Sequence, residues 1–204
     1  MQTKEKLWFT SDWHLGETRL AQLFRPFKNT DENTKEIVSR HNSKVAIDDL
    51  VYVLGDTLYR DADPNIFLPI IGLMNGRKIL LRGNHDRSFS DDLLLNYFEE
   101  IIPEGKSVKI KIEDIECNLN HYPSKGSKSE FNLVGHIHSA FKIQLNMLNV
   151  GVDANHFYPI ESTTVKSIHD CICGIYDEDT FAAKFECNSS FSEIRGTKPS
   201  LLGK

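Results

Sequence analysis

Histidine, aspartate and asparagine side chains follow short apolar segments, at the points where those segments end. Each segment is typical of a buried strand, and in α/β sheets ligands bind beyond the carboxyl ends of the strands. Five of the eight histidines occupy such positions, together with two aspartates and one asparagine. The residues are Asp12, His14, Asp56, Asn84, His85, His121, His136 and His138. We expect them to converge on one site.

This set of donor atoms indicates divalent metal ions. Imidazole and carboxylate without thiolate suit Mn, Fe, Zn or Ni. The donors exceed what one tetrahedral ion needs, but they suffice for two five- or six-coordinate ions about 3.5–4 Å apart that share a carboxylate. Such a pair acidifies a bridging water and clamps phosphoryl oxygens, and a histidine free of the metals can protonate the leaving oxygen. No Cys-x-x-Cys pair occurs, so a thiolate zinc site is poorly supported.

The elements that must position these residues alternate in type along the first half of the chain. Buried strands are predicted at Lys6–Ser11, Leu50–Leu54 and Ile79–Leu81, and helices from Asn29 or Thr30, over Pro64–Met74 and over Asp91–Glu99. Later, apolar and polar residues alternate from Val108 to Leu119 around Glu113-Asp114, which predicts a hairpin with one buried face. Further short strands are expected before Gly135 and around Asn146, and a helix over Pro159–His169. This order predicts an α/β or α+β layered fold.

Length and composition limit the number of domains and the kinds of partner. The 204 residues are enough for one domain, and the polar, Gly- and Pro-punctuated end predicts a loose tail over 187–204 after a domain over 1–186. No apolar run approaches the length of a membrane span, and no signal-peptide pattern opens the chain, so we expect a cytoplasmic protein without a membrane partner. The net charge of −5 argues against long duplex nucleic acid as a partner.

Five short motifs in order resemble those of the calcineurin-like metallophosphoesterase superfamily. They are Asp12-x-His14, Gly55-Asp56, Gly83-Asn84-His85-Asp86, His121 and Gly135-His136-x-His138, and the resemblance spans Leu7 to about Asp153. The segments Arg25-Pro26-Phe27, Asn75-Gly76, His121-Tyr122-Pro123 and Asn149-Val-Gly-Val-Asp153 are similar to those of small bacterial and phage hydrolases within it. The resemblance implies two mixed β-sheets packed together as a sandwich, flanked by helices in an α/β/β/α order, with the site at one edge.

The resemblance also implies a role for each motif residue. Asp12, His14 and His138 would hold the first metal ion. The second would be held by Asn84, His121 and His136, with Asp56 bridging the two ions. His85 would stabilise the transition state or act as the general acid. The two ions would be divalent, with Mn²⁺ as the first candidate and Fe, Zn or Ni as alternatives.

The second motif departs from the pattern of phosphoprotein phosphatases, Gly-Asp-x-x-Asp-Arg-Gly. The aspartate that orients the catalytic histidine there is replaced by Tyr59, and Arg60 matches the phosphate-binding arginine by spacing only. This argues against a phosphoprotein phosphatase and leaves the partner of His85 open, with Asp61 as a weak candidate.

Arginines and one tyrosine are the candidates for binding the substrate. Arg25, Arg60 or Arg82 could hold phosphate through a planar fork, and the alternative for each is surface charge or an intramolecular ion pair. Tyr122 could stack on a base or simply pack beside a ligand residue. We take Arg25, Arg60 and Tyr122 as the candidate substrate-binding residues.

The expected function is hydrolysis of a phosphomonoester or phosphodiester by a metal-bridging hydroxide, with Asp56 and His85 as the catalytic residues. A nuclease or a cyclic-nucleotide phosphodiesterase is the alternative, so the substrate could be a nucleotide. A non-catalytic interaction scaffold with the same fold is a third interpretation, disfavoured because all seven ligand positions hold competent residues. A homodimer is compatible with the sequence, but nothing in it requires one.

Overall fold

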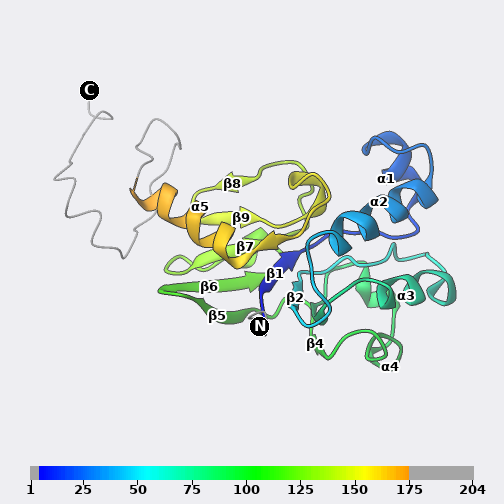
Figure 1. The fold of residues 1–204 in the computed structure, drawn as a ribbon, viewed down its shortest axis with the longest axis horizontal. Coiled ribbons are helices and arrows are strands. Elements are labelled where there is room, and N and C mark those ends of the chain that lie inside the picture. Colours follow the sequence, from blue (N-terminus) through cyan, green and yellow to red (C-terminus); the bar gives the residue numbers. More distant parts are fainter. Residues whose placement is uncertain (1–4, 175–204) are drawn as a thin grey trace.

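Two five-stranded mixed sheets lie face to face, with helices packed around them (Figure 1). This arrangement comes from a computed structural model, which describes residues 5–174. The α/β fold with a two-sheet sandwich expected from the sequence is confirmed. The tail predicted over 187–204 lies outside the described residues. No helix within residues 5–174 is long and apolar enough to cross a membrane.

The first sheet carries the first three motifs. Its order is β10-β1-β2-β3-β4, with β1 (Leu7–Thr10), β2 (Leu50–Val53), β3 (Arg77–Leu81), β4 (Glu100–Ile102) and β10 (Ile160–Glu161). Strands β1 to β4 are parallel, and β10 pairs antiparallel with β1. Because parallel strands end at the same edge of a sheet, the segments after β1, β2 and β3 meet there. The first three motifs are therefore brought together by topology alone.

The second sheet carries the last two motifs. Its order is β5-β6-β7-β9-β8, with β5 (Val108–Ile112), β6 (Ile115–Asn120), β7 (Phe131–Val134), β8 (Ile143–Gln144) and β9 (Met147–Asn149). The predicted hairpin is present as β5 and β6, which pair antiparallel. Strands β6, β7 and β9 are parallel, so His121, Gly135 and Val150 follow them at one edge.

Helices and short turns connect the strands. The helices are α1 (Thr18–Leu23), α2 (Thr30–Asn42), α3 (Pro64–Gly72), α4 (Asp91–Leu94) and α5 (Ser162–Gly174), and the 3-10 turns are η1 (Asp86–Ser88), η2 (Pro123–Lys125) and η3 (Val152–Ala154). The predicted cap of α2 is present, because the Asn29 side chain accepts the Glu32 N–H at 2.8 Å. Helix α4 is shorter than predicted, because the Glu99 N–H bonds to Lys78 of β3 and the chain enters β4.

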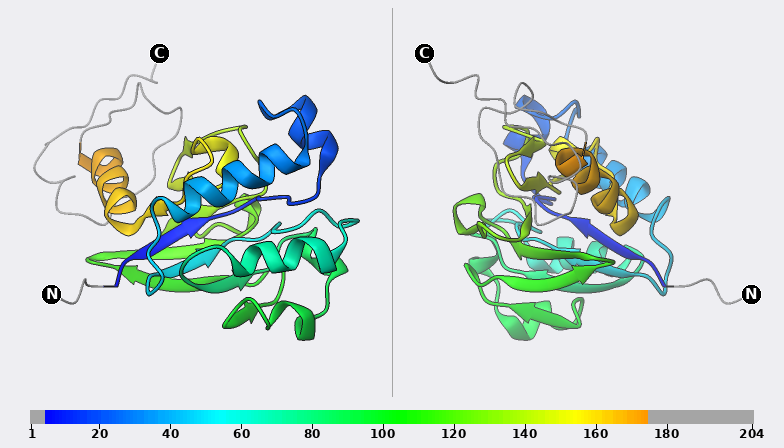
Figure 2. Two further views of the ribbon diagram at one scale, coloured as in Figure 1. Left: turned by 45° about the vertical axis from the view of Figure 1, so that its right-hand side comes forward. Right: turned by 90° about the vertical axis from the view of Figure 1, so that its left-hand side faces the viewer.

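The first sheet is buried on both faces, which explains its continuous apolar runs. Successive side chains in a strand point to opposite faces, so Trp8 faces the helices while Phe9 faces the second sheet. Trp8, Val51, Val53 and Leu80 pack with Ile37, Leu68 and Ile71 of α2 and α3. On the other face Phe9, Leu54 and Leu81 pack with Leu119, Leu133 and Leu148, and with Val165 of α5. Helix α5 accordingly lies beside the second sheet (Figures 1 and 2).

A buried carboxylate ties the start of β1 to the loop before β2. Asp49 accepts the Lys6 N–H at 2.9 Å, the Trp8 indole N–H at 2.8 Å and the Ala46 N–H at 2.9 Å. Burial raises the pKa of Asp49, but these hydrogen bonds outweigh burial and hold the pKa below its usual value. The ionised form therefore stabilises the fold.

We expect Asp49→Asn to lower the free energy of unfolding by about 2 kcal/mol at pH 7, because all three donors lose a charged acceptor and at least one of them would face the amide N–H₂. Since the folded-state pKa is depressed, this contribution is present above the unfolded pKa of about 3.9 and disappears as pH falls through the folded value. Urea unfolding at several pH values should show the gap between wild type and variant closing in acid. The exposed Asp48→Asn is the control and should shift unfolding by less than about 0.5 kcal/mol.

Candidate metal centre

The loops after β1 and β2 run side by side at the sheet edge. The Asp12 N–H donates to Gly55 O and the His14 N–H donates to Asp56 O, both at 3.0 Å. The loop after β7 reaches the same place, because the His136 N–H bonds to the Asp12 carboxylate at 3.0 Å. Backbone hydrogen bonds therefore bring motifs from both sheets into contact.

Many of the candidate ligands have a left-handed backbone. The φ angles are +60° for Asp12, +48° for His14, +54° for Asp56, +74° for His136 and +49° for His138. This conformation is unfavourable for residues with a Cβ, and such residues cluster at functional sites. The surrounding fold holds five of the seven candidate ligands in it.

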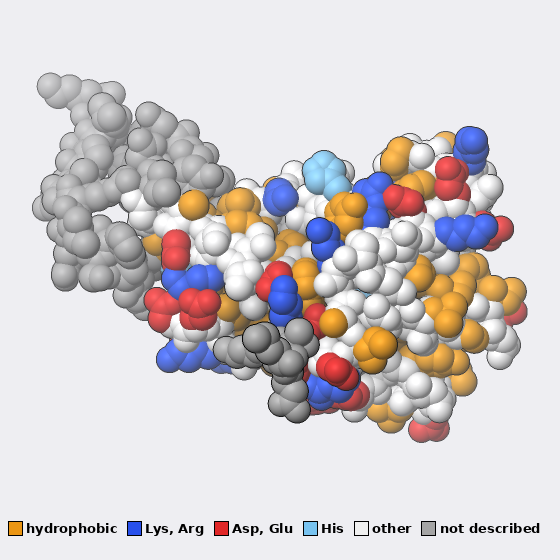
Figure 3. Space-filling model, in the orientation of Figure 1, with side chains coloured by type: hydrophobic (Ala, Val, Ile, Leu, Met, Phe, Trp, Pro, Cys, Tyr) orange, Lys and Arg blue, Asp and Glu red, His pale blue; other side chains and the backbone are white. Residues whose placement is uncertain are grey.

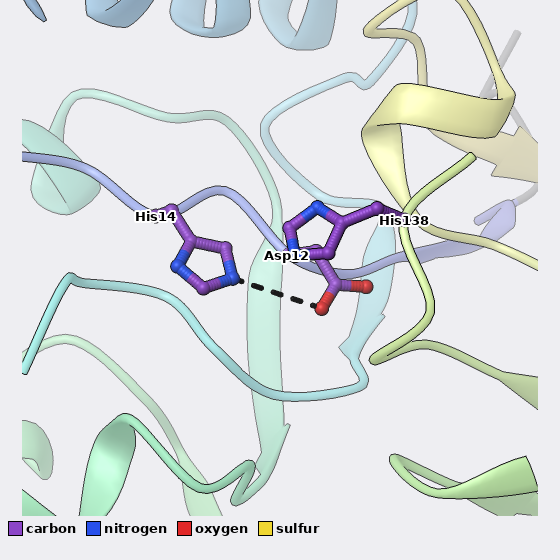
Figure 4. Close-up of side chains that lie close together, drawn as sticks. All are labelled: Asp12, His14 and His138. Carbon is purple, nitrogen blue, oxygen red and sulfur yellow. Dashed lines mark ion pairs between the residues drawn. The ribbon is translucent and has the colours of Figure 1, made fainter. Parts of the chain in front are cut away.

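The first cluster consists of Asp12, His14 and His138 (Figure 4). The His14 Nε2 atom lies 4.0 Å from Asp12 Oδ1, and the His14 and His138 rings lie 4.9 Å apart. Asp12 and His14 are buried, whereas His138 is half-buried. One ligand atom from each of the three lies within 4.8 Å of the others, as a shared metal ion requires.

The second cluster consists of Asp56, His121 and His136, with Asn84 beside it. The His121 Nε2 atom lies 3.2 Å from His136 Nδ1 and 3.4 Å from Asn84 Oδ1. His121 is buried and His136 is exposed. The structure thus brings these four residues together, and it also places ligand atoms of His14, Asp56 and His85 within 4.8 Å of one another.

The Asp56 carboxylate lies between the two clusters. Its Oδ2 atom is 3.5 Å from His14 Nε2 and 3.4 Å from His121 Nε2. Its Oδ1 atom accepts the His85 N–H at 2.8 Å. One oxygen of this side chain therefore faces histidines of both clusters.

The Nδ1 atoms of three imidazoles face oxygen atoms. His14 Nδ1 lies 2.8 Å from Glu17 Oε2, but outside hydrogen-bond geometry. His121 Nδ1 lies 2.6 Å from Leu54 O, and His138 Nδ1 lies 2.7 Å from Asp153 Oδ2, both within hydrogen-bond geometry. An acceptor at Nδ1 fixes the proton there and leaves the Nε2 lone pair for a metal ion. Glu17, Leu54 and Asp153 form the layer behind the candidate ligands.

The residues present fit divalent metal ions. Ligand atoms about 2.0–2.2 Å from one ion lie about 3–3.5 Å from each other, which matches the 3.2–3.4 Å separations in the second cluster. The buried His14 Nε2 atom has no hydrogen-bond partner among the described residues, so a cation would satisfy it. Nitrogen and oxygen donors without thiolate suit a borderline or hard ion.

The charges of the cluster also attract cations. Burial lowers the pKa of His121, but the hydrogen bond to Asp56 and the charges of Asp12 and Asp56 raise it to about 9. Burial raises the pKa of Asp56, yet His121 and His14 hold it far below its usual value. The site thus favours a positive charge at His121 Nε2, which either a proton or a metal ion can supply.

His85 lies beside the clusters without an acidic partner among the described residues. The Arg60 N–H donates to His85 Nδ1 at 3.3 Å, and Arg60 Nη2 lies 3.3 Å from His85 Nε2. The His85 ring lies 4.6 Å from that of His14 and 5.5 Å from that of Tyr59. Burial, together with His14 and Arg60, lowers the pKa of His85. The partner that the sequence left open is therefore Arg60, while Asp61 interacts with Tyr59.

The substrate-binding candidates lie in different environments. Arg25 is buried in an ion pair with Asp153. Arg82 donates to Asp86 O and forms an ion pair with Asp91. Both arginines therefore form the intramolecular contacts that were the alternative to binding phosphate. Arg60 is exposed beside His85.

Tyr122, the aromatic candidate, packs edge-on against two ligand histidines. Its ring centroid lies 4.8 Å from those of His121 and His136, and its hydroxyl contacts Glu104. Stacking on a substrate base stays a prediction.

Asp86 joins the second and third motif loops. Its carboxylate accepts the N–H groups of Asp56 at 2.7 Å, Gly83 at 2.8 Å and Thr57 at 3.0 Å, and the Thr57 hydroxyl at 2.7 Å. Gly83 permits this approach, because a Cβ there would lie 2.2 Å from Asp56 Oδ1. Asp86 thus supports both loops.

We expect Asp86→Asn to lower the free energy of unfolding by about 3 kcal/mol, because an amide N–H₂ would face N–H and O–H donors. Thr57→Val removes a single donor and keeps the shape, so it should cost about 1 kcal/mol. Equilibrium unfolding of both metal-free variants in urea measures the two losses. Equal losses would contradict the linking role of Asp86.

Asp153 is the main functional residue that sequence reasoning missed. It stands at the end of Asn149-Val-Gly-Val-Asp153, which carried part of the family resemblance but no assigned role. The signal that could have found it is its position just beyond a strand, like that of the other candidates. Only the structure shows that it contacts His138 and Arg25.

Comparisons with known proteins bear on the identity of this centre. An uncharacterized protein of Methanocaldococcus jannaschii is 31% identical over 83 residues, which are 40% of this chain and 47% of that protein. The gene 66 protein of Mycobacterium phage L5 is 36% identical over 80 residues, which are 39% of each protein. The matches thus span less than half the length of these relatives.

A solved structure and a family model extend over more of the chain. A protein of unknown function from Aquifex aeolicus shares the fold, with a TM-score of 0.66 and 24% identity over 81% of this chain and 100% of that one. The family model for the calcineurin-like phosphoesterases matches residues 5–166, which include every candidate ligand. The chain therefore belongs to the calcineurin-like phosphoesterase family.

Proposed function

We propose that this protein is a dinuclear metal-dependent phosphoesterase that hydrolyses a phosphodiester. The position of Asp56 Oδ2, 3.5 Å from His14 Nε2 and 3.4 Å from His121 Nε2, is the observation that carries the proposal. A carboxylate oxygen shared by two ligand clusters suits two ions held close together. Two such ions, when bound, acidify a water between them and polarise the phosphoryl oxygens.

The proximity of these side chains supports one ligand set for each ion. Asp12, His14 and His138 would hold one ion, and Asn84, His121 and His136 the other, with Asp56 facing both. Mn²⁺ is the proposed ion, and Fe, Zn and Ni are alternatives that the same donors accept.

His85 and Arg60 would act on the substrate. The His85 ring lies 4.6 Å from that of His14, and one of its nitrogens lies within 4.8 Å of an Asp56 oxygen, so it can hold a proton near the leaving oxygen. Arg60 is exposed and has no carboxylate partner among the described residues, so its guanidinium is free to bind a phosphoryl oxygen. His85 would be the general acid and Arg60 the substrate clamp.

The arginine side chains near the centre favour a phosphodiester over a phosphomonoester as the substrate. Arg25 and Arg82 are engaged in ion pairs, which leaves Arg60 as the unpaired guanidinium beside His85 within residues 5–174. A single arginine suits the one negative charge of a phosphodiester better than the two of a monoester. Nucleotide diesters, cyclic or short, are the substrates that we would examine first.

We expect the wild type with Mn²⁺ to hydrolyse bis-p-nitrophenyl phosphate faster than p-nitrophenyl phosphate. Asp56→Asn should lower kcat/KM by more than about 100-fold, because loss of a ligand costs more than the 10–100-fold typical of residues behind ligands. It should also reduce the bound metal from two equivalents to one or none, as elemental analysis would measure.

Asp48→Asn is the matched control, since it makes the same chemical change on an exposed loop. Near-normal rates and unchanged metal content in Asp56→Asn would contradict the proposed centre. A wild type without bound metal and without turnover would support the interaction scaffold instead. Faster cleavage of the monoester would overturn the assignment to diesters.

The role of His85 depends on the leaving group. p-Nitrophenolate leaves without a proton, whereas the sugar alkoxide of a dinucleotide needs one. We expect His85→Ala to lower kcat by about 10²–10⁴-fold on a thymidine dinucleotide and much less on bis-p-nitrophenyl phosphate, with metal content unchanged. Equal losses on the two substrates would show that His85 is not the general acid.

A further inference from the structure

A buried ion pair lies directly behind the first cluster. Arg25 Nε donates to Asp153 Oδ1 at 2.7 Å, and Arg25 Nη2 donates to Asp153 Oδ2 at 2.9 Å. The side chains are 1% and 9% exposed. Burial raises the pKa of Asp153, but His138 and Arg25 hold it far below its usual value, so the carboxylate is charged. Such a pair is expensive to bury and needs further hydrogen bonds to be stable.

The further hydrogen bonds of Arg25 all go to the metal-binding region or the helix beside it. Arg25 Nη2 donates to Asp12 O at 2.7 Å, and Nη1 donates to Trp13 O at 2.8 Å and to Asn33 Oδ1 at 3.2 Å. With the two bonds to Asp153, all five N–H groups of the guanidinium are used. Arg25 thereby holds the left-handed backbone of the first motif and has no donor left for a substrate.

Asp153 connects the same pair to a ligand of the other sheet. Its Oδ2 atom lies 2.7 Å from His138 Nδ1, which directs His138 Nε2 away from Asp153 and toward the cluster. A carboxylate behind a ligand histidine fixes the ring and increases its basicity. The second cluster has no such pair, because His121 Nδ1 bonds to the neutral Leu54 carbonyl. The two clusters thus differ in what supports them.

We propose that Arg25 and Asp153 are positioning residues that tune the metal affinity of the first cluster and leave the second unchanged. Arg25 fixes Asp12 through its backbone carbonyl, and Asp153 fixes His138 through its imidazole. One ion pair therefore fixes the positions of two of the three residues in the first cluster. This inference rests on the proposed function insofar as that function requires two metal ions.

A purely structural ion pair makes a different prediction. It would lower the stability of the protein when broken, without a change confined to one metal equivalent. Asp49 is a matched control for this alternative, because it is a buried carboxylate with several N–H donors that lies at the other end of β1. Asp49→Asn should destabilise the protein and leave the affinity for both ions as in wild type.

The test is a titration of the metal-free full-length chain with Mn²⁺. Isothermal calorimetry and electron paramagnetic resonance measure the binding. We expect Asp153→Asn to weaken one of the two Mn²⁺ equivalents by about 10–100-fold and to leave the other within a few-fold of wild type. Arg25→Lys keeps the charge but cannot bond to Asp12, Trp13 and Asp153 together, so the same equivalent should weaken. Thermal unfolding of each metal-free variant shows whether it is folded.

The outcomes separate this inference from the proposed function. Suppose that wild type binds two equivalents of Mn²⁺. If Asp153→Asn and Arg25→Lys bind both equivalents as tightly as wild type does, or if both equivalents lose affinity to the same extent, the positioning role is overturned while the dinuclear centre stands. If Asp49→Asn weakens one equivalent just as selectively, the effect is one of stability and the inference is again overturned. A wild type that binds fewer than two equivalents overturns the proposed function, and the positioning role with it. If Asp153→Asn does not fold, Arg25→Lys decides the question alone.

Discussion

The burial of Asp56 as a charged group is the constraint on which the rest of the structure depends. A carboxylate removed from water is stable only if donors and positive charge surround it. The His85 N–H supplies one donor, and the histidines of both clusters face its other oxygen. The residues that surround Asp56 come from both sheets. The Asp56 carboxylate is therefore stabilised only when the two sheets are packed together, and the packed sandwich in turn requires that this buried charge has partners.

The loops that carry the ligands reflect the same requirement. A second buried acid, Asp86, lies so close to Asp56 that it bonds to the Asp56 N–H. Left-handed residues and glycines without room for a Cβ bring these groups together, at a cost in backbone energy. Hydrogen bonds between loops, such as those from the Asp56 and Thr57 N–H groups to Asp86, offset part of that cost.

The sequence predicted the site better than the elements around it. Asp12, Asp56 and His121 could be found because carboxylates and imidazoles after apolar runs mark the carboxyl ends of buried strands. Arg25 was given a role toward substrate because a sequence shows the type of a side chain but not its burial. Its ion pair with Asp153 spans 128 residues, and no local pattern indicates such a contact.

Short elements escaped prediction for a related reason. Strands β4 and β10 have three and two residues, too few for a period to emerge, and their pairing with β3 and β1 defines them. Helix α4 ends at Leu94, before the chain reaches β4 at Glu100, and helical propensity alone does not show this. The second motif showed that the aspartate partner of His85 was absent, but only the fold shows that the Arg60 N–H donates to His85 Nδ1 instead.

The hydrogen bond from the His136 N–H to Asp12, across 124 residues, has a consequence for biosynthesis. At about 5–20 residues per second, the ribosome leaves the first motif without its partner for many seconds. Contacts this distant in sequence are among the slowest to form. A nascent or truncated chain that lacks the second sheet has only part of the proposed ligand set, so the proposed metal centre would be complete only after both sheets are synthesised and folded.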